Sequence, residues 1–219
     1  MDAINTEESF LHRRIQMNVL CLDLEGVLIP EIWQAVATST GIDGLQKTTR
    51  DIPVYDDLMS FRLRLLDQNR ITLSQIQKDI EKMDPLPGAI EFLGWARERF
   101  QVAIISDTFY EFAMPLIAKL GNPMLLCHHL LLDGNKIAGY RLRQNDPKRC
   151  SVRAFKSLDL KVVAAGDSFN DVSMLHEADV GFFFKAPNAV IEQYPDYKLA
   201  ASYEELKTLI ETWRISEVS

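Results

Sequence analysis

The chain has 219 residues, of which 47% are hydrophobic and 25% charged, and it carries a net charge of -7. This is the composition of a soluble globular protein that can bury a sizeable core. The acidic balance argues against a nucleic-acid partner, which would need a basic surface. No apolar run reaches the length of a membrane span, and residues 1–16 lack the apolar middle of a signal peptide. We therefore predict a cytoplasmic protein without a membrane partner. The cysteines Cys21, Cys127 and Cys150 lie far apart in the sequence, which favours free thiols.

The first predicted element is a short buried strand, which follows residues 1–16 as a polar N-terminal extension. Residues 19–22 are apolar, as is typical of a strand buried on both faces of a parallel sheet. Two carboxylates follow it, Asp23 and Glu25, with one residue between them. Side chains at alternate positions of a strand point to the same side, so we expect these two acids to point the same way.

Helices without a second strand are predicted between this strand and a chain break at residues 84–88, where the sequence reads DPLPG. The predicted helices cover residues 32–40, 55–69 and 72–83. The last of them opens with the capping-box pattern Thr72-x-x-Gln75. We therefore predict a small helical unit, residues 32–84, that is inserted into a larger core.

Strands and helices alternate through the rest of the chain. Helices are predicted at 89–100, 110–120, 147–157, 173–178 and 202–213, and strands at 102–105, 124–127, 162–165 and 180–184. A hairpin is predicted from 130–132 to 137–141, with Asp133-Gly134 in its turn. Such alternation predicts a parallel sheet with right-handed crossovers. We predict an α/β fold with three layers, in which residues 17–31 and 85–219 form a Rossmann-like core.

Polar side chains follow several of the predicted strands. They are Asp23 and Glu25 after the first strand, Ser106-Asp107-Thr108 after the second, and the segment 166–171 after a later one, and Lys148 stands at the start of a helix. The carboxyl ends of parallel strands meet at one edge of a sheet, so we expect these groups to converge. So many carboxylates repel one another unless a cation lies among them. A ligand set of oxygen atoms favours Mg²⁺ over zinc.

These residues resemble the haloacid-dehalogenase superfamily of phosphohydrolases. Its four motifs match, in order, Asp23-Leu24-Glu25-Gly26-Val27-Leu28, Ser106, Lys148 and Gly166-Asp167-x-x-Asn170-Asp171. The match runs from Val19 to about Phe184. One position departs from the pattern, because the superfamily usually has aspartate where Glu25 stands. The resemblance implies a Mg²⁺-dependent phosphatase that works through an aspartyl phosphate.

Within the superfamily, the chain is similar to phosphoserine phosphatases. The predicted helical unit occupies the place of their cap, and Arg62 lies where their substrate arginine lies. The chain also resembles a bacterial subgroup that has both phosphoserine phosphatase and phosphoserine:homoserine phosphotransferase activity, in which glutamate is the expected residue at position 25. The segments that carry this second resemblance are 23–33, 49–53, 106–112 and 146–149.

The resemblance implies a role for each motif residue. Asp23 would be the nucleophile and a metal ligand. Glu25 would be the general acid and then the general base, and its backbone carbonyl would bind the metal together with Asp167. The phosphoryl group would be bound by Ser106, the Asp107 amide and Lys148. Asn170 would orient the substrate or Lys148, and Asp171 would orient water or Lys148. Glu31 would hold the substrate ammonium group and Arg62 its carboxylate.

Two pairs of neighbouring residues have more ordinary interpretations. Arg62 and Arg64 lie two positions apart on a predicted helix, so they do not share a face, and we expect Arg64 to be a surface charge. His128 and His129 face opposite sides of a predicted strand, so we interpret them as core or surface residues rather than metal ligands.

Alternatives remain open at the level of the sequence. One is a phosphatase of the same superfamily that acts on another small phosphate ester, because a fold does not fix a substrate. The other is a non-catalytic phosphoacceptor such as a receiver domain, which has only about 100–150 residues as an ordinary single domain and has no inserted cap. The expected partners are phosphoserine, homoserine and water, and a homodimer is compatible with the sequence.

Overall fold

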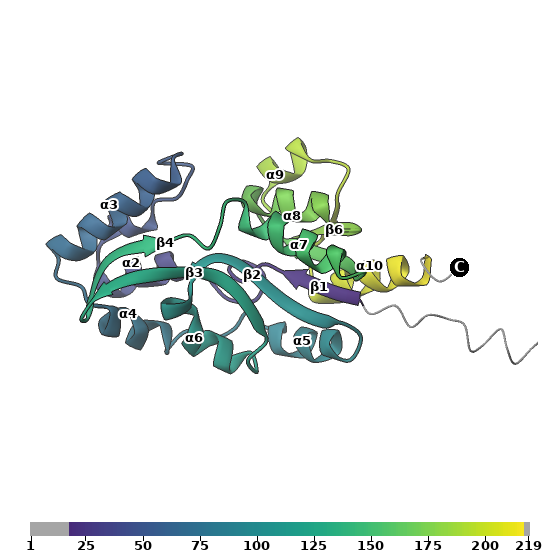
Figure 1. Ribbon diagram of the computed structural model, residues 1–219, viewed down its shortest axis with the longest axis horizontal. Coiled ribbons are helices and arrows are strands. Elements are labelled where there is room, and N and C mark those ends of the chain that lie inside the picture. The colour runs from purple at the N-terminus through teal and green to yellow at the C-terminus, as the bar shows by residue number, and fades with distance from the viewer. Residues whose placement is uncertain (1–17, 217–219) are drawn as a thin grey trace, which may run out of the picture.

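The computed structural model describes residues 18–216 and is built around one seven-stranded sheet (Figure 1). The predicted N-terminal extension, residues 1–16, lies outside the described residues. The strand order is β4-β3-β2-β1-β5-β6-β7, and every neighbouring pair is parallel except β3 with β4. The strands are β1 (Asn18–Leu22), β2 (Gln101–Phe109), β3 (Met124–Asp133), β4 (Lys136–Arg141), β5 (Lys161–Gly166), β6 (Val180–Phe184) and β7 (Lys198–Ala200).

Helices cover both faces of the sheet, which gives the three predicted layers. Successive side chains of β1 point to opposite faces. Leu20 and Leu22 pack in a cluster with residues of α5, α6 and α10, whereas Val19 and Cys21 pack in a second cluster with α7, α8 and α9. These helices are α5 (Ala89–Arg97), α6 (Tyr110–Lys119), α7 (Pro147–Ser157), α8 (Val172–Glu177), α9 (Asn188–Gln193) and α10 (Tyr203–Ser216). The predicted fold class is therefore confirmed.

The segment between β1 and α5 is helical in the described structure, as the sequence predicts. It contains α2 (Ile32–Thr40), the 3₁₀ helix η1 (Asp43–Gln46), α3 (Tyr55–Gln68) and α4 (Leu73–Ile80). The predicted capping box is present at the start of α4. Buried residues of α2, α3 and α4 belong to the same apolar cluster as Leu20 and Leu22. The helical segment is thus packed onto one side of the sheet, and Figure 1 shows α3 beside β4, at the end of the molecule.

Some elements differ from the sequence prediction. The short elements η1, η2 (Phe169–Asp171), α9 and β7 were not predicted, because so few residues carry no clear periodicity. The predicted strands at 124–127 and 130–132 are one continuous strand, β3. The helices predicted to end at residues 83 and 100 end at Ile80 and Arg97, a difference of the size expected where helix ends fray.

The second strand also differs, and this difference shapes the site. Ser106 and Asp107 lie within β2 instead of following it. The register between β2 and β3 shifts between Ile105 and Phe109. An irregularity of this kind redirects side chains near a site. It lies beside β1, where the order of the strands changes direction and where ligands bind in open α/β sheets.

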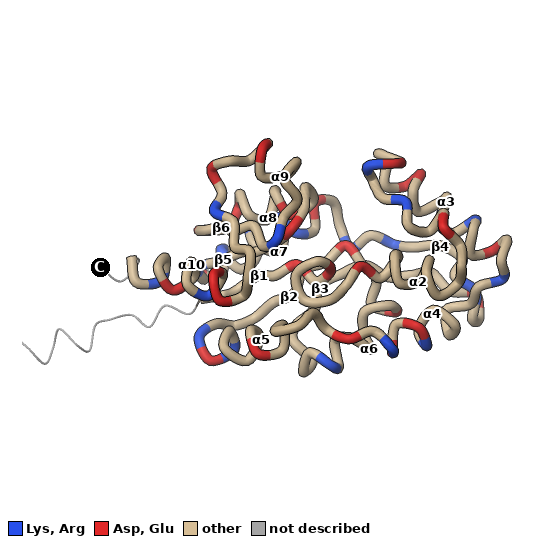
Figure 2. Tube along the Cα trace, turned by 180° about the vertical axis from the view of Figure 1, so that it is seen from behind, with Lys and Arg blue, Asp and Glu red and all other residues tan. Residues whose placement is uncertain are grey.

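Charged residues of both signs are distributed along the helices and loops (Figure 2). None of the described helices combines the length and the apolar composition that a membrane crossing requires.

Candidate active site

The loop after β1 places two carboxylates at the centre of the sheet edge. Asp23 is 5% exposed, and its Oδ1 accepts a hydrogen bond of 2.8 Å from the Leu24 amide. The chain then turns at Gly26, whose φ is +77°. A Cβ atom on Gly26 would lie 2.3 Å from Oδ2 of Asp167, so only glycine fits this turn without displacing that carboxylate.

Lys148 lies at the centre of the acidic residues. It stands in the first turn of α7 and is 1% exposed. Its Nζ lies 2.6 Å from Asp171 Oδ1, 3.0 Å from Asp23 Oδ1 and 3.6 Å from Asp107 Oδ2. Burial by itself would lower the pKa of Lys148, but the three carboxylates hold this pKa well above its usual value. Lys148 is therefore a fixed positive charge that joins three strand ends.

The segment after β5 supplies Asp167 and Asp171. Asp171 is fully buried, and its Oδ2 accepts hydrogen bonds from the amides of Asp167 (2.9 Å) and Ser168 (3.0 Å). Its Oδ1 accepts from Lys148. A Cβ on Gly166 would lie 2.3 Å from Cγ of Asp171, so glycine permits this close approach. Because both its oxygens already accept hydrogen bonds, Asp171 is suited to orienting the loop and the lysine.

Three of these carboxylates could hold a metal ion. Oxygens of Asp23, Asp167 and Asp171 all lie within 4.8 Å of one another. Burial and the charge of Asp171 raise the pKa of Asp23 well above its usual value and the pKa of Asp167 to about 7. The single ammonium group of Lys148 does not balance three carboxylates, and a set of oxygen donors suits Mg²⁺. Since Asp171 is already engaged, Asp23 and Asp167 are the more available ligands.

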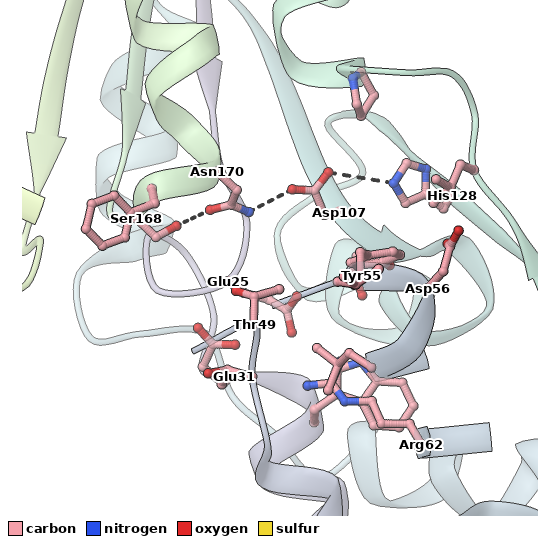
Figure 3. Close-up of a pocket in the computed structure, with 18 of the residues that line it drawn as sticks. Glu25, Glu31, Thr49, Tyr55, Asp56, Arg62, Asp107, His128, Ser168 and Asn170 are labelled. Carbon is pink, nitrogen blue, oxygen red and sulfur yellow. Dashed lines mark hydrogen bonds and ion pairs between the residues drawn. The ribbon is translucent and has the colours of Figure 1, made fainter. Parts of the chain in front are cut away.

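A cavity of about 710 Å³ opens beside this cluster (Figure 3). Among the residues predicted for the site, those that line it are Glu25, Glu31, Arg62, Asp107 and Asn170. The predicted residues that are buried and do not line it are Asp23, Ser106, Lys148 and Asp171, and the half-buried Asp167 lies close to Asp23 and Asp171. The structure therefore brings the predicted residues to one region. Some line the cavity and others lie in a buried layer behind it, and the contact between Lys148 and Asp107 connects the two groups.

Glu25 and Glu31 occupy the start of the helical segment. The Ile32 amide donates a 2.7 Å hydrogen bond to Oε1 of Glu25. Burial, and then the charge of Glu31, raise the pKa of Glu25 to about 8. Burial also raises the pKa of Glu31, against the opposing charge of Arg62. A carboxyl group with a raised pKa can donate a proton near neutral pH, as a general acid must.

Arg62 is the one of the two neighbouring arginines that reaches the cavity, as predicted. It is 7% exposed and lies over the Trp33 ring, 4.5 Å from its centroid, whereas Arg64 is exposed. Its Nη2 donates to the carbonyl oxygen of Lys47 at 2.6 Å. Its Nε is buried without a hydrogen-bond partner among residues 18–216. Burial lowers the pKa of Arg62 to about 10. A buried guanidinium with a free donor is suited to binding an anionic group.

A chain of polar side chains crosses one wall of the cavity, and the sequence did not reveal its last member. Ser168 Oγ donates to the Asn170 carbonyl, and Asn170 Nδ2 donates to Asp107 Oδ2 at 2.7 Å. His128 Nε2 lies 3.6 Å from Asp107 Oδ1 (Figure 3). His128 is 2% exposed, as a core histidine would be, while His129 on the opposite side is half-buried. The contact between Asp107 of β2 and His128 of β3 depends on the register of the two strands, and no sequence motif marks it.

The fold is an open α/β sheet with acids gathered around a buried lysine at the strand ends, which is where ligands bind in such sheets. The sequence model of the haloacid dehalogenase-like hydrolases matches residues 50–176, which is more than half of the chain. The chain therefore belongs to the haloacid dehalogenase-like hydrolase family.

Two curated bacterial proteins are close in sequence. The chain is 57% identical to phosphoserine phosphatase ThrH of Pseudomonas aeruginosa over 192 residues, which cover 87% of this chain and 94% of that protein. It is 55% identical to a phosphoserine phosphatase of Pseudomonas syringae pv. tomato, with 87% and 81% covered. Among solved structures, the phosphoserine phosphatase from T. onnurineus in complex with NDSB-201 has a TM-score of 0.70 at 26% identity, with 89% of this chain and 94% of that chain covered.

Proposed function

We propose that this protein is a Mg²⁺-dependent phosphoserine phosphatase that works through an aspartyl phosphate on Asp23 and also transfers the phosphoryl group to homoserine. The observation that carries the proposal is Asp23 itself, a buried carboxylate at the end of the central strand, 3.0 Å from the ammonium group of Lys148. The two curated relatives named as phosphoserine phosphatases support the choice of substrate.

The metal would be held by Asp23, Asp167 and the backbone carbonyl of Glu25. When bound, Mg²⁺ supplies positive charge that offsets the repulsion between a carboxylate nucleophile and a phosphate ester. Lys148 contributes fixed positive charge from the protein side, and Asp171 keeps the lysine in place. Ser106 and the Asp107 amide would donate hydrogen bonds to the phosphoryl oxygens.

In the first half-reaction, a carboxylate oxygen of Asp23 forms a bond to phosphorus and the bond from phosphorus to the serine oxygen breaks. Glu25 donates its proton to that leaving oxygen. The raised pKa of Glu25, about 8, supports this role, because the group then holds a proton at neutral pH.

In the second half-reaction, the oxygen of an acceptor attacks phosphorus, Glu25 takes the proton of the acceptor, and the bond to Asp23 breaks. The acceptor is water or the hydroxyl group of homoserine. Homoserine differs from serine by one methylene, which is worth only ~1–3 kcal/mol in a pocket. A well-positioned hydroxyl can reach an effective molarity on the order of 10⁵ M, so it can compete with water.

Amino-acid recognition is assigned to Glu31, the last residue of the first core segment, and to Arg62 of the helical segment. We propose that this helical segment, residues 32–84, acts as a cap over the core of residues 17–31 and 85–219. Glu31 would bind the ammonium group, and the unpartnered Nε of Arg62 would bind the carboxylate. Both residues line the same cavity as Glu25 (Figure 3). Serine and homoserine share these two charged groups, so a single pair of side chains would bind either amino acid.

Phosphorus NMR tests the proposal directly. The protein is incubated with phosphoserine and Mg²⁺, with and without homoserine. We expect inorganic phosphate in both samples and homoserine phosphate in the second. If inorganic phosphate is the sole product at saturating homoserine, the transferase activity is wrong. If phosphoserine is unchanged, the phosphatase activity is wrong as well.

A pair of variants separates phosphoserine from other small phosphate esters as the substrate. Arg62→Gln removes a charge-assisted contact, so we expect KM for phosphoserine to rise about 10–100-fold, with p-nitrophenyl phosphate hydrolysis much less affected. Arg64 lies on the same helix but is exposed. Arg64→Gln is therefore the matched control, and it should change neither the KM for phosphoserine nor the hydrolysis of p-nitrophenyl phosphate. If Arg62→Gln loses the same activity on phosphoserine and on p-nitrophenyl phosphate, that result would favour another small phosphate ester as the substrate.

A further inference from the structure

We propose that His128 is a positioning residue for phosphoryl transfer, which acts by holding the Asp107 carboxylate and, through it, Lys148 and Asn170. The inference rests on the proposed function and adds to it a residue outside the four family motifs. It starts from a contact between neighbouring strands, in which Nε2 of the buried His128 lies 3.6 Å from Oδ1 of the half-buried Asp107 (Figure 3).

The hydrogen bonds of His128 define its tautomer. The backbone amide of Arg143 donates to Nδ1 at 3.0 Å. Nδ1 must therefore present a lone pair, so in the neutral ring the proton is on Nε2, the nitrogen that faces Asp107. The imidazole is 2% exposed, with the Arg143 amide bonded to one ring nitrogen and the Asp107 carboxylate near the other. His128 thus presents an N–H donor to one oxygen of Asp107.

The other oxygen of Asp107 faces the buried cluster. Oδ2 accepts a 2.7 Å hydrogen bond from Asn170 and lies 3.6 Å from Lys148 Nζ. Although burial opposes the charge, Lys148, His128 and Asn170 together hold the pKa of Asp107 below its usual value. Asp107 is therefore an anion with one oxygen toward His128 and the other toward Lys148 and Asn170, so fixing the first oxygen also fixes the second.

This arrangement affects the placement of positive charge. Lys148 is shared between Asp171 at 2.6 Å, Asp23 at 3.0 Å and Asp107 at 3.6 Å. Without the donor from His128, Oδ1 of Asp107 is no longer held, and the carboxylate that Lys148 and Asn170 contact through Oδ2 is less firmly oriented. The charge of Lys148 matters most when negative charge shifts during phosphoryl transfer, so the turnover number should fall more than substrate affinity does.

Two substitutions test the roles of the two ring nitrogens of His128 separately. In His128→Asn, the short side chain keeps an acceptor near the Arg143 amide and loses the donor to Asp107. In His128→Gln, the longer side chain keeps the donor toward Asp107 and loses that acceptor. We expect His128→Asn to lower kcat by about 10–100-fold, the range seen when a partner that orients a functional group is removed, while KM changes little. We expect His128→Gln to retain most of kcat while unfolding at a lower temperature.

A purely structural role predicts the opposite ranking, because His128→Gln removes the acceptor of the Arg143 amide. The proposal is overturned if activity follows thermal stability across the two variants, or if His128→Asn has the kcat of the unmodified protein. A double-mutant cycle adds a second test. In an Asp107→Asn background, His128→Asn should have almost no further effect on kcat. If the fold-loss in kcat of the double variant equals the product of the two single losses, His128 does not act through Asp107.

A third readout needs no substrate. Nitrogen-15 NMR of the histidine-labelled protein should show a protonated Nε2 and an unprotonated Nδ1 for His128, and the reverse tautomer would overturn the proposal. If the unmodified protein fails to hydrolyse phosphoserine, the proposed function is wrong. The His128 comparison can then be made with p-nitrophenyl phosphate, so the two failures are distinguishable.

Discussion

The close approach of Gly26 to Asp167 provides a perturbation that replaces no charged residue. A Cβ at position 26 would lie 2.3 Å from Oδ2 of Asp167, far inside ordinary van der Waals contact. The Gly26→Ala substitution therefore requires the carboxylate or the turn to shift. Gly26 also has a φ of +77°, a conformation that costs about 1–2 kcal/mol for a residue with a side chain.

Gly41 is a matched control for this substitution. Its φ is +69°, and its Cβ would meet no heavy atom within 4 Å. Gly41→Ala thus carries the backbone cost alone, so we expect both variants to lose about 1–2 kcal/mol of unfolding free energy. Only Gly26→Ala should also move Asp167. Because a displacement of 1 Å at a catalytic group can cost roughly 100-fold in rate, kcat/KM of Gly26→Ala should fall by about that factor.

The assay is phosphate release from phosphoserine across a Mg²⁺ titration, together with denaturant unfolding of both variants. We expect Gly26→Ala to need more Mg²⁺ for half-maximal activity and Gly41→Ala to behave like the unmodified protein. The reasoning is refuted if Gly26→Ala has the same Mg²⁺ dependence and kcat/KM as Gly41→Ala.

The remaining predictions concern the nucleophile, the metal and the cap. Asp23→Asn should abolish turnover while the protein stays folded, because an amide is a poor nucleophile, and phosphatase activity within about tenfold of the unmodified protein would contradict its role. Asp167→Asn should weaken Mg²⁺ binding and be partly rescued at high Mg²⁺, and activity independent of Mg²⁺ would count against it. Hydrogen exchange of α3 should slow when Mg²⁺ and a phosphate mimic are added, because closure of the cap excludes water, and unchanged exchange there would show that α3 does not close.

The sequence predicted the fold because its strongest patterns are local. The apolar run 19–22 and the later alternation of strands and helices are sufficient for a parallel sheet, and the strand ends then bring Asp23, Lys148 and Asp171 together. Helical periodicity also indicated that Arg62 and Arg64 do not share a face, and the family resemblance then selected Arg62, which is buried while Arg64 is exposed. These features depend on spacing along the chain, which can be read directly.

The features that were missed depend on pairing across space. The register between β2 and β3 shifts between Ile105 and Phe109, so that His128 pairs with Phe109 and its Nε2 lies 3.6 Å from Asp107 Oδ1. No local pattern encodes that contact. The hydrogen bonds from Ser168 to Asn170 and from Asn170 to Asp107 likewise require two strand ends to lie side by side. The roles of the individual site residues stay predictions until they are measured.

Trapping the covalent intermediate tests the central claim most directly. The protein is mixed with phosphoserine and Mg²⁺, quenched in acid within the first turnovers, and digested for mass spectrometry. We predict a phosphoryl group on the peptide that contains Asp23, formed before free phosphate accumulates and lost when homoserine or water accepts it. Phosphoserine turnover in which Asp23 is never phosphorylated, with phosphate released in a single step, would contradict the mechanism.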